Sequence, residues 1–279
     1  MKLLVLVILL NSCNVVKTLT SGETDVGDGF FDGNHGGSNH CTYQNSSEYH
    51  CCTESEKNDS LSPCFTNLNS SLVSFWRLDE DGISSRVDHA GNNTLVPAGA
   101  GLVSANINGR TALDCRASNS SDNIGSAATT GLDFGTNGDF AISFWVYKLS
   151  SGAVEMYILR TNELYLRLPN WDNSQVQTYL DAGNSQTSQL VNLNLNSWEH
   201  VVVNVSRLGG YTYYLNGQHF NHDSSNSTSA NLSSGASFFL CMDNAFSSVL
   251  DGYIDDVGIW SRTLTEGEIY ALSAGETPQ

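Results

Sequence analysis

The chain has 279 residues and a formal net charge of −17 at pH 7. This length accommodates one large domain beside a smaller segment. The acidic charge excludes a nucleic-acid-binding surface, because contact with phosphates relies on clustered lysine and arginine.

The first segment, residues 1–20, is predicted to be a cleaved secretory signal. Lys2 supplies a basic start, and the apolar run LLVLVILL that follows is too short to span a bilayer. The alternative is a lipoprotein signal ending at Cys13, although Asn11 fits that pattern poorly. No later run is long enough to cross a membrane, so the mature chain is expected outside the cell, either secreted or tethered at its start.

Residues 21–67 form a segment rich in Gly, Asp, Asn and cysteine, with little hydrophobic periodicity. Without Cys13 the number of cysteines is even, which suits disulfides in an oxidising compartment. Four cysteines lie close together in this segment: Cys41, Cys51, Cys52 and Cys64. Two local bridges are expected there, with a pairing that the sequence does not give. The alternative is a zinc site that includes His35, His40 and His50, but paired CxxC spacing is absent.

The two remaining cysteines, Cys115 and Cys241, lie in the strand-like runs TALDC and SFFLC. A disulfide between them is the expected remaining pairing, although the sequence does not give the connectivity. Because it would close a long loop, it would stabilise the fold by about 4 to 5 kcal/mol in the chain-entropy model.

Residues 68–275 are predicted to form one β domain. Val, Ile, Tyr, Phe and Thr gather in short runs that alternate with period two. Expected strands cover 72–78, 111–115, 140–148, 155–159, 164–168, 176–180, 198–206, 211–215, 237–242 and 252–260. Their number and spacing favour an all-β, two-sheet antiparallel jelly-roll sandwich. Asn216-Gly217 predicts a tight hairpin, because this pair accepts positive φ angles.

The last expected strand, 252–260, carries apolar side chains on both faces and is therefore predicted to be interior. Strict alternation puts Tyr253, Asp255, Val257 and Ile259 on one face, and Ile254, Asp256, Gly258 and Trp260 on the other. Thr265 followed by Glu268 predicts a capping box. One short helix is therefore expected at the end of the domain.

Seven segments together resemble a known family. They are SFWRLDEDG (74–82), DHAGN (88–92), GRTALDC (109–115), DFAISFWVYK (139–148), NSWEHVVVNV (196–205), YTYYLNGQ (211–218) and IDDVGIWSRTL (254–264). In this order they resemble the laminin-G-like jelly roll of the concanavalin A-like lectin/glucanase superfamily. The resemblance implies a twisted antiparallel sandwich outside the cell that binds carbohydrate or protein and often holds a structural calcium.

The resemblance also suggests where calcium would bind. Calcium takes about six to eight oxygen ligands. Five residues near the expected sandwich edge offer such oxygens: Asp79, Asp88, Asn92, Asp255 and Asp256. The alternative is that they are solvated loop charges or turn-forming residues. A looser set lacks the spacing of a calcium loop and is interpreted as part of a linker: Asp25, Asp28, Asp32 and Asn34.

Carbohydrate binding is the predicted function. Sugars present apolar faces and many hydroxyls, so their sites combine an aromatic side chain with polar groups. The best platform in the sequence contains Trp171, Asp172, Asn173, Tyr165, Arg167 and Tyr179. The alternative is that Trp171 packs over a sheet edge. The expected partner is a carbohydrate or a cell-surface glycoprotein, and the competing class is an adhesive or structural module that binds protein.

An enzyme is not predicted. Glucanases of this superfamily resemble one another in a strand with Glu, Asp and Glu at alternate positions, and no strand here has that series. Glu155 and Glu163 stand alone, and His200 is interpreted as structural. The sequence contains eight possible N-glycosylation sequons, at Asn45, Asn58, Asn69, Asn92, Asn119, Asn204, Asn226 and Asn231.

Overall fold

The structure is a computed structural model of the chain. It describes residues 6–9, 16–19, 41–45, 48–51, 58, 66–80, 85–97, 103–117, 124–126, 132–150, 156–161, 164–168, 176–180, 193–224, 238–241 and 249–279. Two short antiparallel pairs precede the main body: β1 (Leu6–Leu9) with β2 (Val16–Leu19), and β3 (Cys41–Asn45) with β4 (Glu48–Cys51). The side chains of Cys41, Cys51, Cys52 and Cys64 lie outside the described part. Their disulfides, the signal and the domain boundaries stay predictions.

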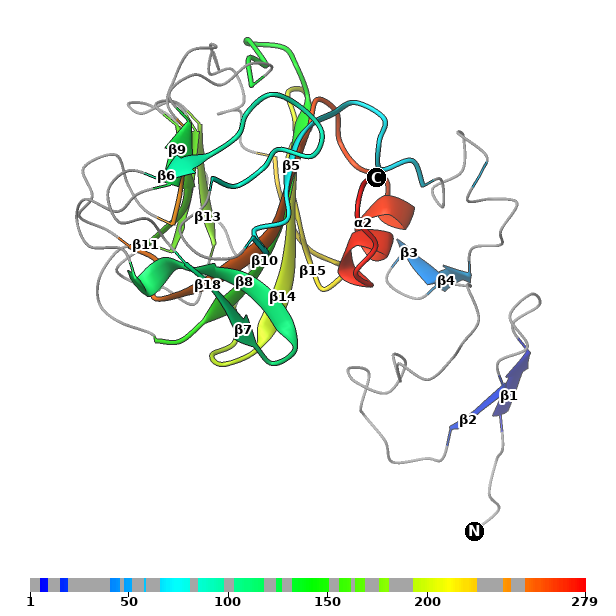
Figure 1. Cartoon of the computed structure of the whole chain (residues 1–279). Helices are drawn as coiled ribbons and strands as arrows, with labels where there is room; N and C mark the ends of the chain where they lie inside the picture. Colours follow the sequence, from blue (N-terminus) through cyan, green and yellow to red (C-terminus); the bar gives the residue numbers. More distant parts are fainter. Residues whose placement is uncertain are drawn as a thin grey trace.

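The main body consists of two antiparallel sheets (Figure 1). The larger sheet contains β5 (Leu72–Trp76), β7 (Ser104–Ile107), β8 (Arg110–Asp114), β10 (Phe140–Lys148), β14 (Trp198–Ser206), β15 (Gly210–Leu215), β16 (Gln218–Asp223) and β18 (Gly252–Trp260). Their order is β16-β15-β14-β10-β18-β8-β7, and β5 pairs with the second half of β18. β18 is therefore an interior strand, as predicted.

The smaller sheet contains β6 (Val96–Pro97), β9 (Ile124–Ser126), β11 (Met156–Arg160), β12 (Leu164–Leu168), β13 (Gln177–Leu180) and β17 (Phe238–Leu240). Their order is β13-β12-β11-β17-β9-β6. The predicted all-β sandwich is thus confirmed, and each strand expected from the alternation occurs with shifts of a few residues at some ends.

The core fills the space between the two sheets. On β10, Phe140, Ile142, Phe144 and Val146 are buried in one cluster with Leu164, Leu166 and Leu168 of β12. Trp76 of the larger sheet stacks on Phe238 of the smaller one, with ring centroids 5.0 Å apart. Each such side chain contributes about 1.5 to 3 kcal/mol through its burial. The period-two pattern therefore determines which side chains of each sheet face away from the core.

A β-bulge changes the side-chain directions that strict alternation predicts for β18. The pairing of β10 with β18 shifts between Ser143 and Trp145, and Asp256 has a φ of 45°. Consequently Ile254, Val257 and Ile259 face the core, whereas Tyr253 and Trp260 pack in clusters on the other side of the sheet. The face predicted for residues after Asp256 was wrong, because one extra residue reverses the alternation.

The predicted disulfide between Cys115 and Cys241 is confirmed, with their Cα atoms 5.3 Å apart. Cys115 begins the short 3-10 helix η1 (Cys115–Ala117) after β8, and Cys241 follows β17. Since β8 and β17 belong to different sheets, this bond links the two layers.

One helix, α2 (Glu266–Ser273), lies against the outward face of the larger sheet (Figure 1). Ile269 and Leu272 pack there against Ala141, Val202 and Trp260. The predicted capping box is present: the Glu268 amide donates to Thr265 Oγ1, and the Thr265 amide donates to Glu268 Oε2. The helix therefore begins where the sequence signal places it.

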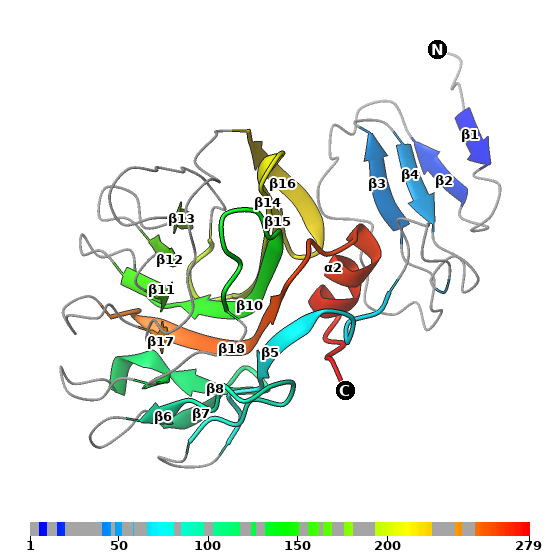
Figure 2. The same ribbon diagram turned by 90° about the horizontal axis from the view of Figure 1, so that it is seen from above.

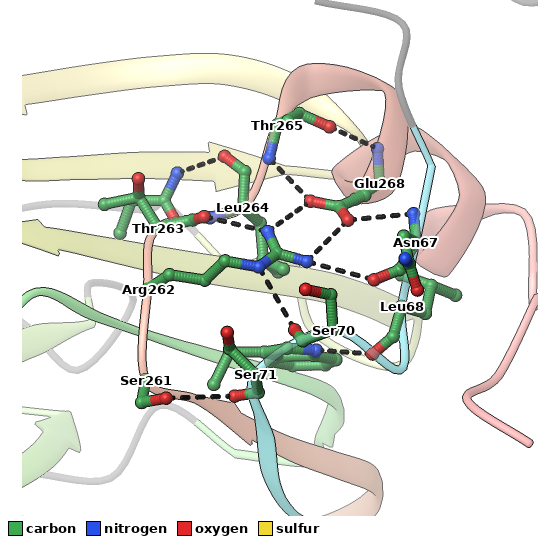
Figure 3. A network of polar contacts seen from close by, with 12 residues as sticks. Asn67, Leu68, Ser70, Ser71, Ser261, Arg262, Thr263, Leu264, Thr265 and Glu268 are labelled. Atoms are coloured by element: carbon green, nitrogen blue, oxygen red, sulfur yellow. Dashed lines mark hydrogen bonds and ion pairs between the residues drawn. The ribbon is translucent and has the colours of Figure 1, made fainter. Parts of the chain in front are cut away.

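Arg262 and Glu268 join the C-terminal part of the domain to its first residues (Figure 3). The Arg262 guanidinium donates to both carboxylate oxygens of Glu268, at 2.7 Å each, and also to the carbonyls of Asn67 and Ser70. The Asn67 amide donates to Glu268 Oε1 at 3.0 Å. Figure 2 shows the result, with the chain entering β5 beside α2 and β18. The network closes the domain at the point where the chain enters and leaves it.

Candidate functional site

The outward face of β12 carries part of the platform predicted from the sequence. Leu164, Leu166 and Leu168 are buried in the core, whereas Tyr165 and Arg167 are half-buried. Successive residues of a strand point to opposite faces, so Tyr165 and Arg167 lie on the face away from the core. The Arg167 guanidinium carbon is 5.6 Å from the centroid of the Tyr165 ring, a cation–π distance.

The neighbouring strand β13 supports this pair. The Arg167 Nε donates to Gln177 Oε1 at 3.0 Å, which fixes the guanidinium along the sheet surface. The backbone of Tyr165 is paired with that of Tyr179. β13 ends the smaller sheet, so the platform lies at a sheet edge. Trp171, Asp172 and Asn173 occur in the connection from β12 to β13, outside the described residues.

A second group of polar and aromatic side chains lies on the outward face of the larger sheet. The Arg110 Nη1 contacts Asp255 Oδ2 and Asp256 Oδ2, each at 2.7 Å. The guanidinium carbon lies 4.3 Å from the Trp145 ring centroid and 5.7 Å from that of Trp198. The role of Arg110 is not predictable from the sequence, because Asp255 and Asp256 are far away in the chain. The available signal was the position of Arg110 at the start of a strand whose middle residues, Ala112 and Leu113, are apolar.

The two aspartates of this group have unusual acidities. Desolvation, followed by the neighbouring charge of Asp256, raises the pKa of Asp255 to about 8 despite the bonds to Arg110. Desolvation also raises the pKa of Asp256, and the Arg110 hydrogen bond opposes this shift. Asp255 Oδ1 is buried and has no hydrogen-bond partner among the described atoms. The pair therefore favours one retained proton near neutral pH.

Three of the five residues proposed for calcium already bond to other groups of the chain. Arg110 already provides the positive charge between Asp255 and Asp256. The carboxylate of Asp88 accepts from the backbone amides of Phe75, Ala90 and Asn93, so it shapes a loop. The remaining two candidates, Asp79 and Asn92, are exposed.

The described residues contain no group of three or more His, Cys, Asp or Glu side chains placed to hold a metal ion. Calcium binding by the five residues stays a prediction.

His200 forms a hydrogen bond that resembles part of a catalytic pair. Its Nε2 is 2.8 Å from Ser143 Oγ, but both residues are only 1% exposed. Desolvation, followed by the charge of Arg110, lowers the pKa of His200 to about 3. Its Nδ1 has no partner among the described atoms. Because both side chains are buried and no group of the described residues bonds to Nδ1 to orient the imidazole, the arrangement favours the structural interpretation of His200.

A sequence profile described as the concanavalin A-like lectin/glucanases superfamily matches residues 120–270, which is more than half of the chain. The chain belongs to this superfamily. The expectation drawn from the seven sequence segments is thereby confirmed. No curated protein matches the chain.

Among the solved structures with the same fold are receptor-binding domains of botulinum neurotoxins. The binding domain of botulinum neurotoxin serotype D has a TM-score of 0.60 and 16% identity, over 76% of this chain and 53% of that domain. The serotype D ligand-binding domain in complex with N-acetylneuraminic acid has a TM-score of 0.58 and 16% identity, over 75% of this chain and 52% of that domain. The neurotoxin DC binding domain in complex with rat synaptotagmin II has a TM-score of 0.59 and 15% identity, over 75% of this chain and 52% of that domain.

The chain spans about half the length of these toxin domains. At such low identity the likeness shows the sandwich fold alone. In the part of the chain that the structure describes, no helix is both long and apolar enough to cross a membrane.

Proposed function

We propose that this protein is a non-enzymatic carbohydrate-binding module, secreted or exposed at the cell surface. The observation that carries the proposal is the pair Tyr165 and Arg167, held together on the outward face of an edge hairpin. The tyrosine ring offers an apolar surface for the CH face of a sugar, and the guanidinium offers hydrogen-bond donors for its hydroxyls. Trp171, Asp172 and Asn173 follow in the same hairpin and would complete the site.

Two further observations support the proposal. The disulfide between Cys115 and Cys241 suits an oxidising compartment, which agrees with an exported protein. A toxin domain of the same fold was solved with a sialic acid, so this sandwich is compatible with glycan recognition. The buried Ser143–His200 pair gives no support to hydrolysis.

The second candidate function is adhesion through a protein partner. It is favoured by the neurotoxin domain that was solved with rat synaptotagmin II. In that case the sandwich serves as a scaffold, and soluble sugars would not compete with the partner.

The test is a glycan array probed with the full chain, the variants Tyr165→Ala, Arg167→Gln and Trp171→Ala, and Arg116→Gln as a matched control. Arg116 is also partly exposed, at 43% of its side chain, but it pairs with Asp114 next to the larger sheet. Wild type and the control should be retained by the same glycans, and the three variants should lose retention. Equal retention of all variants would refute the site, whereas no retention of wild type would refute carbohydrate binding.

A further inference from the structure

Two histidines of β16 lie on the same face of the larger sheet because of a β-bulge. β16 is the terminal strand of its sheet, and its side chains are mostly exposed. Its pairing with β15 places Tyr214 opposite His219 and Thr212 opposite His222, with a register shift at Phe220. Without the shift, residues three apart on a strand would point to opposite faces. Because of the bulge, His219 and His222 are placed as residues i and i+2 of a regular strand are, on the same face.

Contacts with β15 confirm this common face. Thr212 Oγ1 lies 3.0 Å from the Nδ1 of His222. The ring of His219 packs edge-on against Tyr214, with centroids 5.7 Å apart. Both contacting residues belong to one strand and are two positions apart, so they share a face. Both histidines remain exposed to solvent.

The environment of each imidazole suits a metal ligand. When His222 carries its proton on Nδ1, it donates to Thr212 and leaves the lone pair of Nε2 available. The edge-on contact with Tyr214 restricts the orientation of the His219 ring, and the side chain stays exposed to solvent. Imidazole nitrogen is a preferred ligand of zinc, copper and nickel, but not of calcium or magnesium.

From this geometry we infer that His219 and His222 form a binding site for a divalent transition metal, with zinc as the probe. Water would complete the coordination, because no third His, Cys, Asp or Glu joins a metal-holding group among the described residues. The site lies on the larger sheet, separate from the hairpin proposed to bind sugar, and does not depend on that proposal.

The experiment is calorimetric titration of zinc into the full chain, produced without a histidine tag and stripped of metal. His219→Ala and His222→Ala are the test variants. His89→Ala is the matched control, because His89 is equally exposed but belongs to a loop beside β5. Circular dichroism checks that every variant is folded. Magnesium is titrated in parallel as an ion that prefers oxygen ligands.

Wild type and His89→Ala should each bind one zinc ion at this site with the same affinity. Neither should bind magnesium there. Either test variant should bind at least about tenfold more weakly, since even the loss of an outer-shell partner costs about 10- to 100-fold. Zinc binding that persists unchanged in both test variants would place the ion elsewhere, for example on the Cys-rich segment, and would overturn the inference. Absence of zinc binding to wild type would overturn it as well.

Discussion

Arg110 sets the electrostatics of the outward face of the larger sheet. Its guanidinium bonds to the carboxyl groups of Asp255 and Asp256 and covers the Trp145 ring, so three ionisable groups lie in a region with little water. Buried charges are tolerated when they are paired, and an unpaired one shifts its pKa. The raised pKa of Asp255 and the lowered pKa of His200 are two consequences of the same desolvation.

These two shifts predict how stability depends on pH. The pKa of Asp255 rises from 3.8 to about 8 on folding. Between these values the folded chain retains a proton that the unfolded chain loses, so stability falls as pH rises. The pKa of His200 falls from 6.5 to about 3 on folding, so between these values its contribution makes stability rise with pH. The effects of Asp255 and His200 offset each other between about pH 4 and 6.5, and of these two only the Asp255 effect continues from 6.5 to 8.

The unfolding free energy of wild type should therefore fall by about 2 kcal/mol between pH 6.5 and 8, at about 1.4 kcal/mol per pH unit for one proton. Asp255→Asn should abolish this fall. Denaturant titrations at several pH values measure this. Asp133→Asn, at an exposed position, is the control and should keep the wild-type slope. A wild-type stability that rises with pH over this interval would contradict the assigned protonation.

At the scale of elements, the glutamate of the capping box does more than begin a helix. Glu268 is fully buried and accepts from Arg262, from the Thr265 amide and from the Asn67 amide. Glu266 stands in the same first turn but is half-exposed and outside this network. Variants of these two glutamates therefore distinguish the effect of an acidic side chain at the helix start from the effect of the Arg262–Glu268 network.

Glu268→Ala should lower the unfolding free energy by about 3 to 5 kcal/mol, because it leaves the Arg262 guanidinium without its charged partner. Glu266→Ala should cost less than about 1 kcal/mol, the usual range for an acidic side chain at a helix start. Chemical denaturation of both variants provides the comparison. Similar losses in the two would show that the network adds nothing beyond the cap.

Strand elements were predictable from the sequence where one face is apolar. β10 and β12 follow the alternation that predicted them. β7 and β16 were missed because they are terminal strands with polar or exposed side chains, so no hydrophobic period marks them. The β18 bulge also escaped prediction, since two adjacent aspartates do not reveal which one adds the extra residue.

Candidate site residues were predictable only when local pattern determined their direction. Tyr165 and Arg167 lie on the outward face because the leucines between them are in the core. The partners of Asp255 and Asp256 were not foreseen, because Arg110 is 145 and 146 residues away. The Asn204 sequon shows the same limit: its amide bonds the backbone of Leu264 in a buried position, so glycosylation there is incompatible with the fold.

For the whole molecule, the disulfide between Cys115 and Cys241 ties one sheet to the other across a sequence separation of 126 residues. Replacing both cysteines by alanine should reduce the unfolding free energy by about 5 kcal/mol, because the unfolded chain regains the freedom of a long loop. Guanidinium chloride unfolding of the double variant measures the loss. A change below about 1 kcal/mol would mean that packing alone holds the layers together.

The central claim is that this sandwich binds carbohydrate without altering it. The most direct measurement is titration calorimetry of the full chain with a glycan selected on the array, followed by mass spectrometry of the recovered glycan. Saturable binding, competition by free sugar and an unchanged glycan mass are the expected results. A cleaved glycan, or the absence of saturable binding to any glycan, would contradict it.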